Sequence, residues 1–104
     1  MFLAHINDAV VGFSATRAVN DDTTELAGIV VLEGMHGLGL GTALLEAATQ
    51  SAAAAGSQHI SVKTEATNEG ALGFYRGNGF TDTRRVVEDV EGQPMELMEM
   101  MLSL

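Results

Sequence analysis

The segment from Val30 to Gln50, VVLEGMHGLGLGTALLEAATQ, constrains the fold more than any other part of the chain. It places four glycines between an apolar run and a run with helical character. Glycine inside regular structure costs about 0.5–1 kcal/mol relative to alanine. Its repeated use therefore indicates a turn whose backbone lies very close to another group. The glycines are Gly34, Gly37, Gly39 and Gly41.

The composition is that of one globular domain, which we expect to span residues 1–104. The chain is 46% hydrophobic and carries 14 acidic residues against 5 Lys plus Arg, a net charge of −9. Such a charge repels nucleic acid and anionic membranes, so neither is expected as a partner. It mildly favours a cationic substrate, although acidity that only keeps the protein soluble explains it equally well.

The chain contains no cysteine, which excludes disulfides, thiolate metal ligands and catalysis by an enzyme thiol. His5 and His59 stand at no metal-ligand spacing, so no metal site is expected. No apolar run approaches the roughly 18–20 residues of a membrane span, and the N-terminus lacks the basic region of a signal peptide. We expect a cytoplasmic protein.

Hydrophobic patterning predicts the element order β-β-β-α-β-α-β-β. Gly56 ends the first helix and Asn68 caps the second. A strand–helix–strand crossover at the centre is parallel and right-handed, and hairpins flank it. The sequence therefore predicts an α/β fold with a mixed, mostly antiparallel sheet and helices on its faces. The expected strands span 1–6, 10–19, 25–32, 58–64, 80–90 and 95–104, and the expected helices 40–55 and 69–76.

Two of these strands are apolar on both alternating faces. The segment 25–32, ELAGIVVL, therefore reads as a central strand buried on both sides. The last strand, 95–104, carries most of the six methionines. They serve either the core or a subunit interface, and a homodimer would cover an exposed apolar strand.

A glycine-rich turn that opens a helix is a known solution for binding an anion, because the first helical N–H groups have no internal partner. The P-loop would require Lys directly after its last glycine, but Thr42 follows Gly41. The dinucleotide fingerprint would require its third glycine at position 42. The spacing present is instead HGLGLG, over residues 36–41.

A second motif, TNEGALGFYRGNGF, carries Asn68, Ala71, the pair Phe74–Tyr75 and the pair Gly79–Phe80. The two motifs, in this order and on these elements, resemble the GNAT superfamily of acetyl-coenzyme A-dependent N-acetyltransferases. The glycine motif of that family begins with Gln or Arg, where this chain has His36. Because that position acts mainly through its backbone N–H, the change should be tolerated.

The resemblance implies transfer of acetyl from acetyl-CoA to a small-molecule or peptide primary amine, by direct attack in a ternary complex. Family members normally begin with one more strand and two helices, which wall the substrate site. This chain is abbreviated, a fragment, or completed by a partner subunit. The alternatives are an acyl-CoA-binding module with little catalysis, one half of an oligomer, or an unrelated α/β domain.

The resemblance also implies roles for individual residues. Asn68 would bond the pantetheine arm of the cofactor, and Tyr75 would protonate the departing thiolate. The β-strand backbone at Ile29, Val30 and Val31 would pair with the pantetheine arm. The amides of His36, Gly37, Leu38, Gly39, Leu40, Gly41 and Thr42 would hold the pyrophosphate.

The general base is less defined. Glu25 lies six residues before Val31, which predicts that both side chains point to one face of the strand. Glu25 also matches the position of the base in the histone-modifying branch of the family. Other branches use a carboxylate five residues before the motif's Asn, where this chain has Lys63. Glu33, Glu65 and an ordered water are further candidates.

Overall fold

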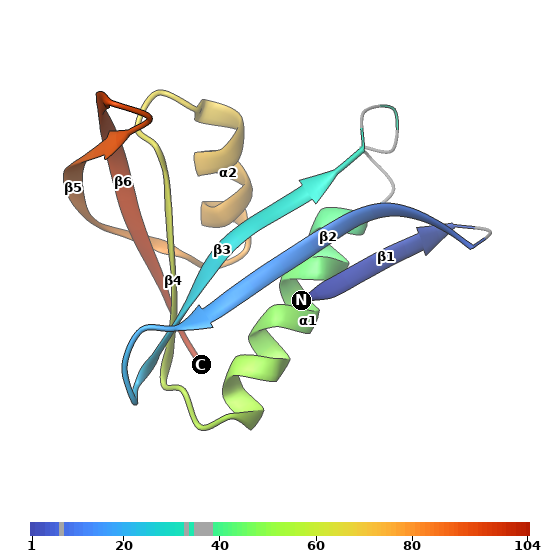
Figure 1. The fold of residues 1–104 in the computed structure, drawn as a ribbon. Coiled ribbons are helices and arrows are strands. Elements are labelled where there is room, and N and C mark those ends of the chain that lie inside the picture. Colours follow the sequence, from blue (N-terminus) through green and yellow to red (C-terminus); the bar gives the residue numbers. More distant parts are fainter. Residues whose placement is uncertain (7, 33, 35–38) are drawn as a thin grey trace.

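The computed structural model (Figure 1) describes residues 1–6, 8–32, 34 and 39–104. The predicted order of elements is confirmed. Neither of the helices in these ranges is long and apolar enough to cross a lipid bilayer. The elements are β1 (Phe2–Ile6), β2 (Ala9–Ala18), β3 (Thr23–Val31), α1 (Leu40–Ala54), β4 (His59–Glu65), α2 (Glu69–Gly77), β5 (Thr81–Val90) and β6 (Gln93–Ser103).

The strands form one six-stranded sheet in the order β1-β2-β3-β4-β6-β5. Only β3 and β4 pair in parallel, and all other neighbours are antiparallel. The crossovers through α1 and α2 advance in the same direction along the sheet, so right-handed connections place both helices on one side. Figure 1 shows both helices behind the sheet. We call this side the helix face and the other side the open face.

The core lies between the helix face and the two helices. The last strand is internal, between β4 and β5. Its side chains Met98 and Met100 belong to the core cluster, whereas the buried Leu97 and the partly exposed Met101 lie on the alternate side of the strand, the open face. Met98 and Met100 therefore serve the core, and a homodimer through the other side of this strand stays a prediction. The core cluster comprises Leu26, Leu45, Ala48, Ile60, Val62, Leu72, Tyr75, Phe80, Met98 and Met100.

The open face shows one clear difference from the sequence prediction. β3 is central as predicted, but the prediction that both its faces are buried is wrong. Val30 is 47% exposed, and Leu32, just beyond the strand, is 52% exposed. The physical reason is that both described helices pack on the opposite face. Only the side chains that point toward the helices, such as Leu26, are buried among core residues.

The closing hairpin is tighter than the segment EGQP suggested. Val90 pairs with Gln93, so the turn contains only Glu91 and Gly92. Both have positive φ, 53° and 81°, as two-residue hairpin turns of the mirror-image type require. The strand β6 therefore begins two residues earlier than the patterning indicated.

Candidate functional site

The sheet opens between its two parallel strands. β3 and β4 pair only from Thr23 opposite His59 to Glu25 opposite Ser61, although β3 continues to Val31. On the helix face, a pocket of about 520 Å³ lies beside this opening, and we call it the splay pocket. It is lined by Ile29, Val31, Gly41, Asn68, Gly70, Ala71, Phe74 and Tyr75. The structure thus brings together residues of both sequence motifs and the end of β3.

A β-bulge in β3 decides which side chains reach this pocket. Ala15 pairs with Gly28 whereas the next residue, Thr16, pairs with Leu26, so Ala27 is an extra residue in the strand. Leu26 lies in the core on the helix face, and Ile29 packs against the same cluster. The extra residue shifts the alternation of side chains by one position along the strand.

The bulge makes the prediction that Glu25 and Val31 share a face wrong. Val31 lines the splay pocket on the helix face, whereas Glu25 lines a different pocket on the open face. The two residues still flank the place where β3 and β4 separate. Glu25 thus stands at the last parallel pair, on the open face, and Val31 at the far end of the unpaired segment, on the helix face.

The N-terminus of α1 borders the splay pocket, and no side chain of residues 1–6, 8–32, 34 and 39–104 caps it. Gly39 takes the N-cap position with φ 75°, and the first turn carries no acidic residue. A side chain at Gly41 would lie against the Phe74 ring, since its Cβ would stand 3.5 Å from two ring carbons. The first N–H groups of α1, at Leu40, Gly41 and Thr42, suit an anion. The predicted contacts of His36, Gly37 and Leu38 lie outside the described residues.

The N-terminus of α2 is built differently. The Oδ1 atom of Asn68 accepts a hydrogen bond from the Ala71 N–H at 3.1 Å, which confirms the predicted cap. Glu69 adds a negative charge to the first turn. Capping occupies the oxygen of the Asn68 side chain. Its Nδ2 group has no hydrogen-bond partner among the described residues, so it is a donor for a ligand in the pocket that Asn68 lines.

Tyr75 is a buried member of the core that also lines the splay pocket. Its ring makes edge-on contacts with Phe74 and Phe80, with centroids 5.3 and 5.4 Å away. Burial raises the pKa of the Tyr75 hydroxyl above its usual value of 10. The hydroxyl is therefore protonated at neutral pH and can donate a proton to a leaving group.

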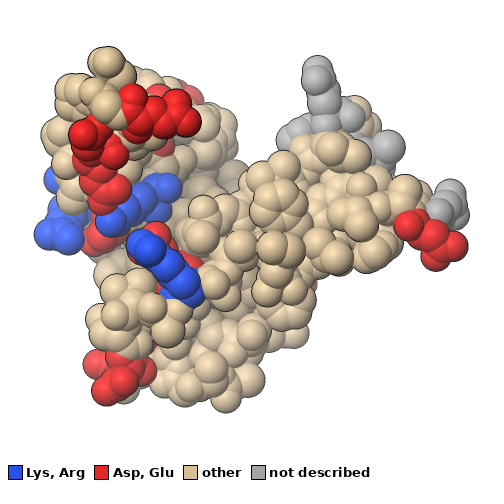
Figure 2. Space-filling view, in the orientation of Figure 1, with Lys and Arg blue, Asp and Glu red and all other residues tan. Residues whose placement is uncertain are grey.

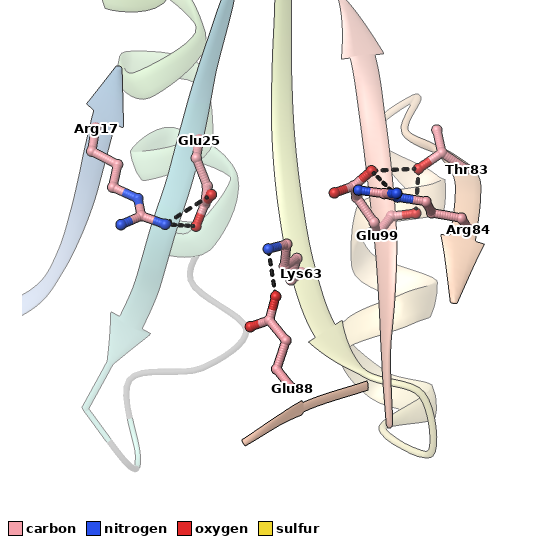
Figure 3. A network of polar contacts seen from close by, with 7 residues as sticks. All are labelled: Arg17, Glu25, Lys63, Thr83, Arg84, Glu88 and Glu99. Atoms are coloured by element: carbon pink, nitrogen blue, oxygen red, sulfur yellow. Dashed lines mark hydrogen bonds and ion pairs between the residues drawn. The ribbon is translucent and has the colours of Figure 1, made fainter. Parts of the chain in front are cut away.

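The second pocket, on the open face, has a volume of about 280 Å³ and is strongly polar; we call it the polar pocket. Its charged lining residues belong to three ion pairs, which Figure 3 shows: Arg17–Glu25, Lys63–Glu88 and Arg84–Glu99, at 3.2, 2.6 and 3.2 Å. The lining residues are Val19, Asn20, Thr23, Glu25, Ser61, Lys63, Arg84, Glu99 and Met101.

Sequence reasoning missed most of this network. Lys63 stands where other branches of the family have a carboxylate, and no local pattern distinguishes Arg17, Arg84 and Glu99, because only the strand pairing brings them together. The hydrogen bond with Glu88 raises the pKa of Lys63, so its ammonium stays charged and does not act as a base. Of the other candidate bases, Glu65 is exposed at the end of β4 and Glu33 lies outside the described residues.

Comparisons with known proteins agree with this geometry. The sequence profile of the Acetyltransferase (GNAT) family matches residues 1–80. No curated protein matches the sequence. Among solved structures, a GNAT family acetyltransferase from Elizabethkingia anophelis with acetyl-CoA bound is 21% identical, with a TM-score of 0.86 over 98% of this chain and 74% of that one.

Two further structures are similarly close in fold. An IAA acetyltransferase from Bacillus cereus is 21% identical, with a TM-score of 0.85 over 98% of this chain and 75% of that one. The ribosomal-protein-S18-alanine N-acetyltransferase from Escherichia coli is 24% identical, with a TM-score of 0.80 over 95% of this chain and 64% of that one. These likenesses establish the fold, and the profile covers well over half of the chain. The chain therefore belongs to the GNAT family of acetyltransferases.

Proposed function

We propose that this chain is an N-acetyltransferase, which moves an acetyl group from acetyl-CoA to a primary amine in a ternary complex. The observation that carries the proposal is the splay pocket. It joins the start of α1, Asn68 and Tyr75 in one cavity beside the opening of the sheet. The acetyl-CoA bound to the neighbour from Elizabethkingia anophelis supports the same choice of ligand.

The residues of the splay pocket fit the parts of acetyl-CoA. Ile29, Val31 and Phe74 offer an apolar surface to the pantetheine arm, and the β3 backbone past Glu25 is not paired with β4. The start of α1 suits the pyrophosphate. When bound, acetyl-CoA would supply the acetyl group as a thioester.

The reaction needs two proton transfers, one on each side of the sheet. The amine nitrogen forms a bond to the thioester carbonyl carbon, the carbon–sulfur bond breaks, and Tyr75 donates a proton to the leaving sulfur. The nitrogen loses a proton as the amide forms, and a proton returns to the Tyr75 oxygen from solvent. An alkylammonium has a pKa of about 10.4, so removing its proton at pH 7 costs about 4–5 kcal/mol. Glu25 would accept that proton, directly or through a water molecule. The chain has no cysteine, so no thiol of the enzyme can carry the acetyl group.

Titration of the purified protein with acetyl-CoA by calorimetry tests the first half of the proposal, with desulfo-CoA as the control ligand. We expect binding at micromolar strength for both ligands. Release of the CoA thiol in the presence of a panel of amines tests the second half. Absence of acetyl-CoA binding would contradict the proposal.

Substitution of the proposed acid tests the mechanism. We expect Tyr75→Phe to lower kcat by about 10²-fold, the lower end for a proton-transfer group, while acetyl-CoA affinity is retained. Glu25→Gln should also lower kcat. The matched control is Glu96→Gln, which removes a carboxylate paired with Arg85 outside both pockets. Unchanged turnover in both Tyr75→Phe and Glu25→Gln would rule out these roles.

A second candidate is an acyl-CoA-binding module with little catalysis alone. It is favoured by the open face, where Val30 and Leu32 are about half exposed. In this case a second copy would cover the open face in a homodimer. Tight acetyl-CoA binding without transfer to any amine, together with a dimer in sedimentation, would favour it.

A further inference from the structure

We propose that the amine acceptor also carries a carboxylate, as a free amino acid does, and that it binds in the polar pocket. Its ammonium would face Glu25 and Glu99, and its carboxylate would face Lys63 and Arg84. This inference rests on the proposed acetyl transfer and specifies the class of acceptor.

The position of the polar pocket suits an acceptor. Glu25 and Ser61 form the last parallel pair before β3 and β4 separate, and both line the pocket. Ile29 and Val31, farther along β3, line the splay pocket on the other face. A molecule in the polar pocket therefore lies across the sheet from the splay pocket. Its volume of about 280 Å³ is at the low end for ligand sites and fits a small molecule.

The charges of the polar pocket are arranged by depth. The carboxylates of Glu25 and Glu99 are 17% and 18% exposed, whereas Arg17 and Arg84, which pair with them, are each 68% exposed. In the third pair the order is reversed, with Lys63 28% and Glu88 42% exposed. The inner part of the site therefore holds two carboxylates and the Lys63 ammonium, and the two arginines lie at the rim. Figure 2, which views this open face, shows Lys and Arg side chains beside acidic ones on the lobe that carries β5 and β6.

The balance of charge at the pocket differs from that of the whole chain. The chain as a whole is strongly acidic, which favours a cationic acceptor. The pocket lining instead contains two carboxylates, Glu25 and Glu99, and two cations, Lys63 and Arg84. A polycation would meet like charge at Lys63 and Arg84, and a polyanion would meet like charge at the carboxylates. An acceptor with one charge of each sign fits both.

Arg84 retains donors for a carboxylate. It bonds to the Glu99 Oε1 atom through Nε at 3.2 Å, and Thr83 also donates to that carboxylate oxygen at 3.3 Å. A guanidinium has five N–H donors in a planar fork. The two terminal nitrogens of Arg84 are therefore suited to a carboxylate that approaches from the rim, in the paired geometry that arginine favours.

The test compares acceptors that differ only in the carboxylate. L-alanine, L-alaninamide and ethylamine form one series, and L-lysine, L-lysinamide and cadaverine form another. Thiol release from acetyl-CoA is measured for each compound. We expect kcat/KM for the free amino acids to exceed that for the amides and decarboxylated amines by about tenfold or more, from charge-assisted hydrogen bonds. Equal or better turnover of the amides or amines would overturn the inference.

Two neighbouring arginines make a matched pair of variants. Arg84→Gln should bring the preference for the free amino acid close to one. Arg85→Gln removes the same charge from the next residue of β5, but Arg85 pairs with Glu96 and does not line the polar pocket. This control should retain the preference. Loss of the preference in both variants would overturn the local role of Arg84.

Binding measurements separate this inference from the proposed function. L-alanine and L-alaninamide are titrated into the protein with desulfo-CoA present, and into the Arg84→Gln variant. Selective binding of L-alanine that is lost in the variant would support the inference even without turnover. Absence of any difference would overturn it. Acetyl-CoA titration by itself decides the proposed function, because it does not depend on the polar pocket.

Discussion

The two faces of the sheet use the same strands for different purposes. The helix face carries aliphatic and aromatic side chains that pack under α1 and α2, whereas the open face carries three ion pairs around the polar pocket. Figures 1 and 2 show the two helices behind the sheet and the charged groups in front of it. We infer that the helix face supplies most of the stability, and that the open face is free to recognise a charged ligand.

Two adjacent methionines of β6 test this contrast with the largest expected effect. Met100 is fully buried on the helix face, whereas Met101 is partly exposed and lines the polar pocket. Met100→Ala should lower the free energy of unfolding by about 2–5 kcal/mol. Met101→Ala should cost about 1 kcal/mol or less, because little apolar area is lost. Urea denaturation of both variants measures the difference, and equal losses would indicate that the open face is covered in solution.

Two glycines test the same contrast through the backbone. A Cβ at Gly12 would lie 2.8 Å from the Val30 carbonyl oxygen and 3.3 Å from Leu44 Cδ1, so Gly12→Ala should cost about 1–3 kcal/mol. A Cβ at Gly28 would meet nothing within 4 Å, so Gly28→Ala should leave the stability unchanged or slightly higher. Thermal unfolding compares them. If the Gly12→Ala variant were as stable as Gly28→Ala, the backbone around Gly12 would have to shift to accept the methyl group at little cost in free energy.

Substitutions of Asn68 test whether one residue of the helix face contributes to stability and to ligand binding through different atoms. Asn68→Ala removes the cap of α2 and should cost about 1 kcal/mol, whereas Asn68→Ser should preserve most of the cap. Both lose Nδ2, so both should weaken acetyl-CoA binding by about tenfold. Calorimetry and thermal unfolding on the same samples measure the two effects. Unchanged affinity in Asn68→Ser would restrict this residue to capping.

Among the substitutions expected to lower the stability, Arg17→Gln has the smallest effect. The Arg17 side chain is 68% exposed in the pair with Glu25, and exposed pairs contribute about 0.2–1 kcal/mol. Arg17→Gln should therefore lower the free energy of unfolding by less than Met100→Ala or Gly12→Ala does. At high salt the loss should be smaller still, because the ion pair is screened. Unfolding at low and high ionic strength measures this. A loss as large as that of Met100→Ala would contradict the division of roles between the faces.

Much of the fold could be predicted from the chain because its signals are local. Apolar periodicity located every strand and helix to within a few residues, and Asn68 and Gly56 marked the ends of helices. The two motifs also identified residues that meet in the splay pocket, such as Gly41 and Tyr75. These predictions succeeded because capping, turn formation and amphipathic patterning depend on neighbouring residues.

The side-chain directions in β3 could not be predicted in the same way. Alternation by two residues assigned Glu25 and Val31 to one face, but the bulge at Ala27 separates them. Gly28, next to the bulge, is only a weak signal, because a glycine inside a strand often accompanies a bulge but does not show which residue is extra. The irregularity exists only in the pairing of β3 with β2, so it depends on a partner strand rather than on the local sequence.

The amino-acid sequence by itself determined the order of elements, the cap of α2 and the absence of an enzyme thiol. Only the tertiary structure decided that both helices share one face and that the polar pocket forms on the other. The pair Lys63–Glu88 spans 25 residues and the pair Arg84–Glu99 spans 15. Such contacts follow from strand order and register, which long-range pairing sets for the sheet as a whole.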